Sequence, residues 1–288
     1  MPQESKIEIP EPEQPQPAAE ATAPQKSLGR PSAKEIFTEV AANARRELRR
    51  TNLALAISGF GGGAFLGLSA LGMAFVSVLL GHSSADHLIA SMFYPVGFIV
   101  VIIGRSQLFT ENTLYPAALV LAERKHILRT LRLWTVVLPA NLAGALGFAA
   151  LAAFTPGIDR NFVNAISQAG TMALDHPFST VFWSAVIAGW LIALTAWLVS
   201  GSHSITGSVM VIWMLTFFIA LGNFAHCIAT SCDILVAVLA GHATWTAYGW
   251  WLLAAAAGNI VGGVVLVAVL EYGQAIFAEE SEPGQDSG

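Results

Sequence analysis

The sequence predicts an all-α integral membrane protein with six transmembrane helices, of which the second and the fifth are broken. The composition, six apolar stretches and polar interruptions within two of them support this prediction. Of 288 residues, 55% are hydrophobic and only 11% are charged, which is too apolar for a soluble domain of this length. Crossing a bilayer takes about 20 helical residues. Stretches of sufficient length cover residues 52–80, 87–121, 131–154, 178–200, 205–240 and 247–270.

The distribution of Lys and Arg predicts that both termini are cytoplasmic. The segment directly before the first stretch holds Arg45, Arg46, Arg49 and Arg50, and four Lys or Arg residues lie at 124–132, whereas the opposite side carries almost only Arg160. We expect a disordered cytoplasmic tail at 1–33, an interfacial amphipathic helix at 34–50, a transmembrane domain at 51–275 and a cytoplasmic tail at 276–288. A plain extension of the first transmembrane helix is an equally good account of residues 34–50.

An internal repeat is indicated by matching marks in the two halves. Phe109, in the interrupted second stretch, lies 32 residues before Asn141, and His226, in the interrupted fifth, lies 33 residues before Asn259. Each asparagine is followed by a glycine three residues later, in Asn141-Leu-Ala-Gly144 and Asn259-Ile-Val-Gly262. Three crossings per copy require the copies to be inverted, as in an aquaporin-like arrangement. Non-helical backbone in a bilayer needs protein or water beside it, so the two breaks are expected to meet in one site.

His226 is the residue that most clearly indicates a function. An ionisable side chain at this depth is costly and usually marks a transport pathway or a relay. Because histidine exchanges protons near neutral pH, His226 could neutralise or orient a small solute, with Thr110 and Asn112 as hydrogen-bonding partners. The alternative is a buried structural histidine bonded to a backbone carbonyl.

The motifs around the two breaks resemble the formate/nitrite transporter family. Leu108-Phe109-Thr110 and Asn112 match the loop that splits the family's second helix, and His226 with Ala229 matches its central histidine segment. The chain departs from the family at several polar positions. Gln107 and Ala225 replace acidic residues, Thr230 replaces an asparagine, and no lysine follows Lys125.

The resemblance implies a homopentamer in a bacterial inner (plasma) membrane, with one pore per subunit for a small monovalent anion or its conjugate weak acid. It places a periplasmic gate at Leu108, Phe109 and Thr110, and a cytoplasmic constriction at Tyr94, Phe98 and Ile219. His226 then lies between the two, and Thr230 follows it along the path. Neither a cofactor nor a nucleic-acid partner is expected.

The remaining polar groups have structural or alternative interpretations. Arg105 and Glu111 flank the first break and are expected to pair across it. Cys227 and Cys232 do not fit a familiar zinc pattern with His226, so no metal is expected. Ser69 and His226 could instead serve a rhomboid-like intramembrane serine hydrolase, although Gly67-Leu-Ser69-Ala-Leu71 lacks the closing glycine of a nucleophile elbow. A non-transporting membrane sensor or scaffold is the third possibility.

Overall fold

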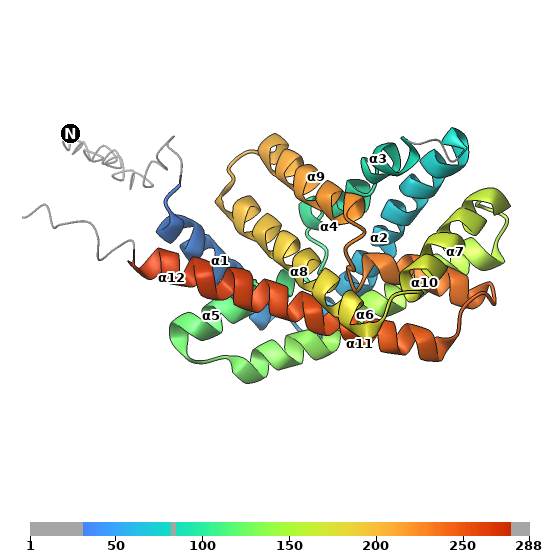
Figure 1. Cartoon of the computed structure of the whole chain (residues 1–288). Helices are drawn as coiled ribbons and strands as arrows, with labels where there is room; N and C mark the ends of the chain where they lie inside the picture. The colour runs from blue at the N-terminus through green and yellow to red at the C-terminus, as the bar shows by residue number, and fades with distance from the viewer. Residues whose placement is uncertain (1–30, 82–84, 278–288) are drawn as a thin grey trace, which may run out of the picture. The chain divides into compact units, whose positions relative to one another are not determined.

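A computed structural model describes residues 31–81 and 85–277. Most of the two expected tails therefore lies outside the described residues. Every regular element of the described part is a helix (Figure 1). Five helical segments are long and apolar enough to cross a membrane: Asn52–Leu80, Asp86–Ile103, Ile127–Phe154, Phe178–Gly201 and Trp245–Ala275. The expectation of an all-α membrane protein is confirmed.

The first interruption divides the second apolar stretch. Helix α3 (Asp86–Ser91) leads into α4 (Pro95–Ile103), which ends at Gly104, and a single 3-10 turn (Glu111–Thr113) precedes α5 (Tyr115–Glu123). Arg105 has a φ of 58°, a left-handed conformation that a helix cannot contain. Seven residues, 104–110, then run without regular structure before the turn.

The second interruption has the same plan. Helix α9 (Ile205–Leu221) and helix α10 (Ala229–Leu239) are separated by residues 222–228. Asn223 has a φ of 50°, so the helix stops there for the same backbone reason as at Arg105. Both halves are too short to span a bilayer alone.

Helix α1 (Ala33–Arg49) is a separate element. Ser32 and Glu35 form a capping box at its start, and extended Arg50 separates it from α2 (Asn52–Leu80). The interpretation of 34–50 as an extension of the first transmembrane helix is therefore wrong. The apolar face of α1 is buried against other helices of the chain, principally α5, α8 (Phe178–Gly201) and α12 (Leu270–Phe277), through Val40, Ala41, Ala44 and Leu48.

Helix α7 (Arg160–Leu174) was not anticipated from the sequence. It carries Asn, Gln and Ser among its apolar residues and so gives no transmembrane signal. It packs against α10 and α2. At Gly170 a Cβ atom would come within 2.4 Å of the Asp233 carbonyl oxygen, so only glycine permits this approach.

Two helix pairs are packed backbone to backbone. Helix α2 lies against α6 (Ile127–Phe154), and α8 lies against α11 (Trp245–Gly263), which continues through a π-helical turn, Val264–Val269, into α12. A Cβ at Gly144 would lie 2.0 Å from the Phe60 carbonyl oxygen, and one at Gly262 would lie 2.1 Å from that of Val186. The glycines at 59, 63 and 67 also face α6, so they pack within the chain.

Candidate functional site

The first break is held by the side chain of Asn141 on α6. Its Oδ1 accepts a hydrogen bond from the Phe109 N–H at 2.8 Å, and its Nδ2 donates to the carbonyl oxygens of Gly59 and Gln107 at 2.7 and 2.9 Å. The Gln107 N–H in turn donates to Ser58 Oγ at 3.1 Å. One fully buried amide therefore ties the loop to both α2 and α6.

The second break is held in the same way by Asn259 on α11. Its Oδ1 accepts from the Cys227 N–H at 2.9 Å, and its Nδ2 donates to the carbonyl oxygens of Ala185 and Ala225 at 2.8 and 3.0 Å. The Ala225 N–H donates to Ser184 Oγ at 3.0 Å. Sequence reasoning missed the two serines, although Ser58-Gly59 and Ser184-Ala185 occupy equivalent places in their helices.

These two clamps correct the alignment of the halves. Phe109 and Cys227 are equivalent because each donates to its asparagine from 32 positions before it. His226 therefore corresponds to Leu108, and the equivalence between Phe109 and His226 that the sequence indicated is wrong by one residue. The error arose because matching was based on side-chain type, whereas the clamps bind backbone.

His226 is completely buried and its hydrogen bonds define its tautomer. Nδ1 accepts from the backbone N–H groups of Ile228 and Ala229 at 3.3 and 3.0 Å, so it carries no proton. The imidazole is therefore neutral with its proton on Nε2, which donates to Thr110 Oγ1 at 2.9 Å. This bond joins the two breaks, which confirms that they meet.

An aromatic column lies on one side of His226. The Phe98 ring is edge-on to the imidazole with centroids 5.0 Å apart, and Tyr94 follows at 5.2 Å from Phe98. Both aromatic side chains are buried, as is Ile219 on α9. Tyr94 and Phe98 are thus in contact, and Ile219 belongs to the same buried apolar core; the constriction expected from the three stays a prediction.

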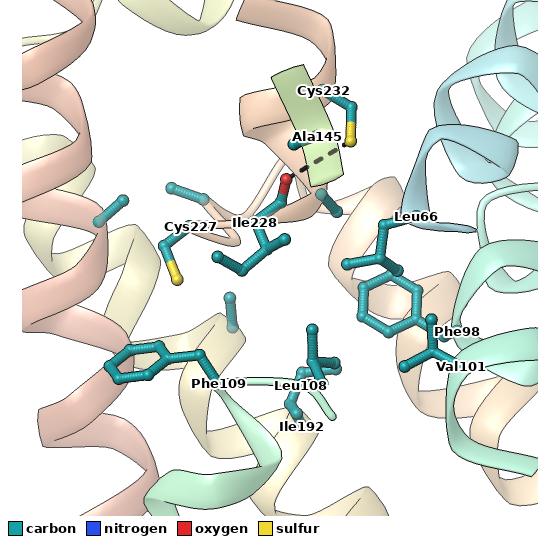
Figure 2. Packing of buried hydrophobic residues seen from close by; sticks show 14 of the residues in the cluster. Leu66, Phe98, Val101, Leu108, Phe109, Ala145, Ile192, Cys227, Ile228 and Cys232 are labelled. Atoms are coloured by element: carbon teal, nitrogen blue, oxygen red, sulfur yellow. Dashed lines mark hydrogen bonds between the residues drawn. The ribbon is translucent and has the colours of Figure 1, made fainter. Parts of the chain in front are cut away.

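Leu108 and Phe109 directly precede Thr110 in the chain, and both side chains are fully buried. Figure 2 shows that the two side chains leave the loop in different directions, Leu108 near Ile192 and Phe109 on the Cys227 side. The Phe109 ring meets Trp134 edge-on at 5.9 Å. His226 itself is 0% exposed, so in this conformation solvent does not reach the imidazole.

The expected positions of the two gates are not compatible with the expected orientation of the chain. The break contacts α2 at Ser58, whereas the Tyr94 carbonyl accepts from Ser69 Oγ, eleven residues or about 16 Å further along that helix. Leu108 thus lies on the side of the N-terminus and Tyr94 on the opposite side. If both termini are cytoplasmic, the expected gates are interchanged: Leu108–Thr110 faces the cytoplasm and Tyr94 the periplasm.

Two further expectations at the first break need correction. The Asn112 amide donates to Gln107 Oε1 and to the Leu108 carbonyl oxygen, so it braces the loop rather than facing His226. Among the described residues no ion pair joins Arg105 to Glu111: Arg105 is exposed and Glu111 is buried. Arg105, with its left-handed backbone, lies at the exposed start of the loop, whereas Glu111 lies in the buried turn at its end.

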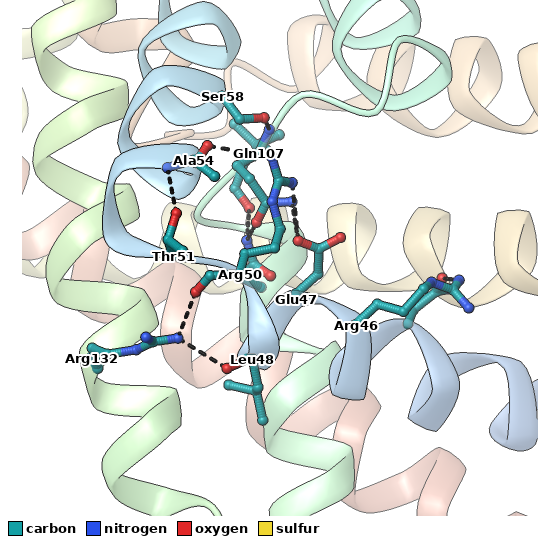
Figure 3. A network of polar contacts seen from close by, with 12 residues as sticks. Arg46, Glu47, Leu48, Arg50, Thr51, Ala54, Ser58, Gln107 and Arg132 are labelled. Carbon is teal, nitrogen blue, oxygen red and sulfur yellow. Dashed lines mark hydrogen bonds and ion pairs between the residues drawn. The ribbon is translucent and has the colours of Figure 1, made fainter.

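A polar network instead connects the first break to α1. Glu47 Oε2 accepts from Gln107 Nε2 at 2.8 Å and from Arg50 Nη1 at 3.1 Å, and Figure 3 shows these residues beside Ser58. Sequence reasoning had not paired Glu47 with the loop. The residue that could have indicated this pairing is Gln107, because its amide can donate a hydrogen bond to a carboxylate, whereas an ionised acidic residue could not.

The structure does not place the described side chains as a serine hydrolase or a metal site would require. Ser69 Oγ donates to the Tyr94 carbonyl oxygen while His226 is bonded to Thr110, so the two do not form a nucleophile–base pair. Cys227 and Cys232 are buried and free. No group of three or more His, Cys, Asp or Glu side chains within the described ranges could hold a metal ion.

The sequence profile of the formate/nitrite transporter family matches residues 34–273. The chain belongs to this family. It is a family of transporters and channels, so the protein is a transporter or channel rather than an enzyme.

Individual relatives and solved structures agree with the family. The chain is 32% identical over 243 residues to inner membrane protein YfdC of Escherichia coli K12, covering 83% of this chain and 77% of YfdC. It is 33% identical over 197 residues to a probable formate transporter of Methanothermobacter thermautotrophicus, covering 62% and 72% of the two chains. An FNT family ion channel superposes with a TM-score of 0.74 at 22% identity, over 86% of this chain and 99% of that one. A pentameric formate channel with formate bound has a TM-score of 0.68 at 20% identity, over 79% and 98%.

Proposed function

We propose that the protein is a channel for a small monovalent anion or its conjugate weak acid, and that the solute passes His226. The buried Thr110–His226 bond is the observation that carries this proposal, because it is a polar contact at the point where the two breaks meet, with the Phe98 ring against the imidazole. A bare anion at the bilayer centre costs at least about 2.5–3.5 kcal/mol. A solute that accepts a hydrogen bond or a proton at this point avoids part of that cost.

The orientation of His226 favours an anionic or hydrogen-bond-accepting solute. Its Nε2–H points away from α10, and its Nδ1 caps the first N–H groups of that helix. The positive end of a helix dipole disfavours a cation and stabilises an anion nearby. A solute replacing Thr110 as the partner of Nε2 would receive this N–H, and any proton exchange would pass through Nε2 because Nδ1 is already engaged.

We further propose that the channel consists of two inverted three-helix repeats and assembles as a pentamer. The duplicated asparagine clamps support the repeat, since Asn141 and Asn259 make the same three bonds in the two halves. The assembly named for the structural relative, a pentameric formate channel, supports the oligomer. Native mass spectrometry should then give five copies of the 30.4 kDa chain.

Solute flux into liposomes tests the function. Purified protein should admit formate or nitrite faster than a neutral control solute, with acetate, lactate and hydrosulfide defining the size limit, at several pH values. The family relatives named for formate make it the first solute to try. A passive anion channel should show little pH dependence, whereas passage as the neutral acid should rise about tenfold for each unit by which the pH falls.

Substitution of His226 tests its role. His226→Phe removes the N–H donor while keeping an aromatic ring and should abolish flux; His226→Asn keeps an amide N–H and should retain part of it. Unchanged flux in both variants would remove His226 from the mechanism. A folded pentamer without flux for any solute would instead favour the sensor or scaffold, to which the loss of acidic residues at Gln107 and Ala225 already lends support.

A further inference from the structure

A basic pocket lies between α1 and the turn that joins α5 to α6, far along the chain from the His226 site. It encloses about 240 Å³. Arg45, Leu48 and Arg49 of α1 form one wall, and Leu119, Glu123, His126 and Arg129 form the other. Arg132 fixes the two walls together, because its Nη2 donates to the carbonyl oxygens of Leu48 and Arg50 at 3.0 and 3.1 Å.

The pocket carries an excess of positive charge that the described residues do not balance. Three arginines face one glutamate. Glu123 is already engaged, by an ion pair with Arg45 and by a 2.9 Å contact with His126 Nε2. The guanidinium groups of Arg49 and Arg129 make no hydrogen bond or ion pair within the part of the chain that the structure describes.

The Glu123 carboxylate in this pocket is ionised and bonded to Arg45 and His126. The hydrogen bond from Arg45, followed by that of His126, holds the pKa of the Glu123 carboxyl below its usual value. Glu123 therefore neutralises Arg45 and leaves the other two arginines free. Like charges that line one pocket repel each other, so an anion between them would be stabilised.

The surface next to the pocket is apolar. Ile127, Leu128 and Leu131, on the first turns of α6, are 60%, 78% and 47% exposed. Arg129 lies among them in the sequence, so a cationic group and an exposed apolar surface are presented by the same helix end. An anionic phospholipid has the matching shape, with a phosphate at the interface and acyl chains along the helix.

We propose that this pocket binds the phosphate of an anionic phospholipid headgroup, with Arg49 and Arg129 as its ligands and the apolar face of α6 beside the acyl chains. Guanidinium groups suit this role because they bind phosphate oxygens through paired N–H groups. A basic pocket between helices on the cytoplasmic side of a membrane protein is a typical site for such headgroups. The site is independent of the solute path.

Lipid binding to the purified protein tests the proposal without relying on transport. Protein in neutral detergent is titrated with phosphatidylglycerol, and bound lipid is counted by native mass spectrometry. Phosphatidylcholine serves as the zwitterionic control. The double variant Arg49→Gln/Arg129→Gln should bind phosphatidylglycerol roughly thirtyfold more weakly, from the loss of two interfacial charges.

The matched control is Arg46→Gln/Arg124→Gln. It removes the same charge from the same two segments, but neither residue lines the pocket; Figure 3 shows Arg46 apart from the Glu47–Gln107 network. An equal loss of lipid in both double variants would overturn the proposal by reducing it to general surface attraction. Displacement of the lipid by millimolar inorganic phosphate would also overturn it, in favour of a soluble anion. If the double variant does not fold, the exposed single change Arg129→Gln should still weaken binding measurably, and no weakening would contradict the site.

Discussion

At the residue scale, the structure defines which nitrogen of His226 donates a hydrogen bond and which accepts one. The sequence predicts that His226 is buried and polar in an apolar passage, but not which nitrogen carries the proton. That information lies in the backbone of residues 226–229, which bends so that two N–H groups meet Nδ1. His226 is therefore both a helix cap and a hydrogen-bond donor, and its two nitrogens have separate tasks.

Replacement of Thr110 tests this assignment. Thr110→Val keeps the shape of the side chain but removes the oxygen that accepts from His226 Nε2, so a buried N–H loses its partner. We expect the free energy of unfolding to fall by about 1–3 kcal/mol, and flux to change because the resting hydrogen bond is absent. Thermal unfolding in detergent and liposome flux measure the two effects. Thr110→Ser retains the hydroxyl and should behave like the wild type; equal behaviour of the valine and serine variants would show that the bond contributes nothing.

At the element scale, each broken helix depends on an unbroken neighbour. The loops at 104–110 and 222–228 have backbone groups that no helix satisfies, and such groups are expensive in a membrane. One asparagine amide serves each loop because it offers both an acceptor and two donors. The helix pairs α2–α6 and α8–α11 approach closely through glycines, which places that amide within reach of both partners.

Asparagine-to-aspartate changes test the clamps. In Asn141→Asp the carboxylate can still accept from the Phe109 N–H, but it cannot donate to the Gly59 and Gln107 carbonyl oxygens, and it brings an unpaired charge into the core. We expect a loss of about 3 kcal/mol or more of stability, and a similar loss for Asn259→Asp. Unfolding curves provide the measurement. Exposed Asn161→Asp is the control, and strongly unequal losses at the two clamps would contradict their equivalence.

The link between α1 and the first break makes a different prediction. Gln107→Glu places a second carboxylate against Glu47, and the repulsion should release the loop from α1 and lower the unfolding temperature. Adding Glu47→Gln restores a carboxylate–amide bond with the donor and acceptor exchanged, so the double variant should recover most of the loss. A double-mutant cycle measures this coupling. Additive effects of the two changes would mean that the bond is not made.

The sequence predicted some of these elements and missed others for identifiable reasons. Polar residues within apolar stretches revealed both breaks, and the Asn-x-x-Gly motifs marked the repeat. Asn141, Gly144, Asn259 and Gly262 were expected only to pack helices; that the two asparagines also bind the loops is known from their hydrogen bonds. Helix α7 gave no signal because its composition is mixed. The expected Arg105–Glu111 ion pair is not formed among the described residues because Arg105 is exposed while Glu111 is buried, and residue type alone does not predict that difference. The register between the halves was off by one because only the hydrogen bonds of Phe109 and Cys227 define it.

At the scale of the whole molecule, composition was sufficient to predict an all-α membrane protein, and the family match and the helices agree. The orientation of the proposed solute path across the membrane is not decided by composition. It depends on which side of the membrane holds the N-terminus, and this choice also decides whether Leu108 or Tyr94 faces the cytoplasm. Charge distribution favours cytoplasmic termini, with the basic turn at 124–132 on the same side.

Cysteine labelling in intact cells decides that orientation. Helix α6, 28 residues long, extends about 42 Å, so Lys125 before it and Arg160 beyond its other end lie on opposite sides of the membrane. Both residues are exposed, while the native Cys227 and Cys232 are buried and should give little background. A membrane-impermeant maleimide should label Arg160→Cys in intact cells and Lys125→Cys only after permeabilisation. The opposite pattern would put the termini outside, and the Leu108 loop would then form the periplasmic gate.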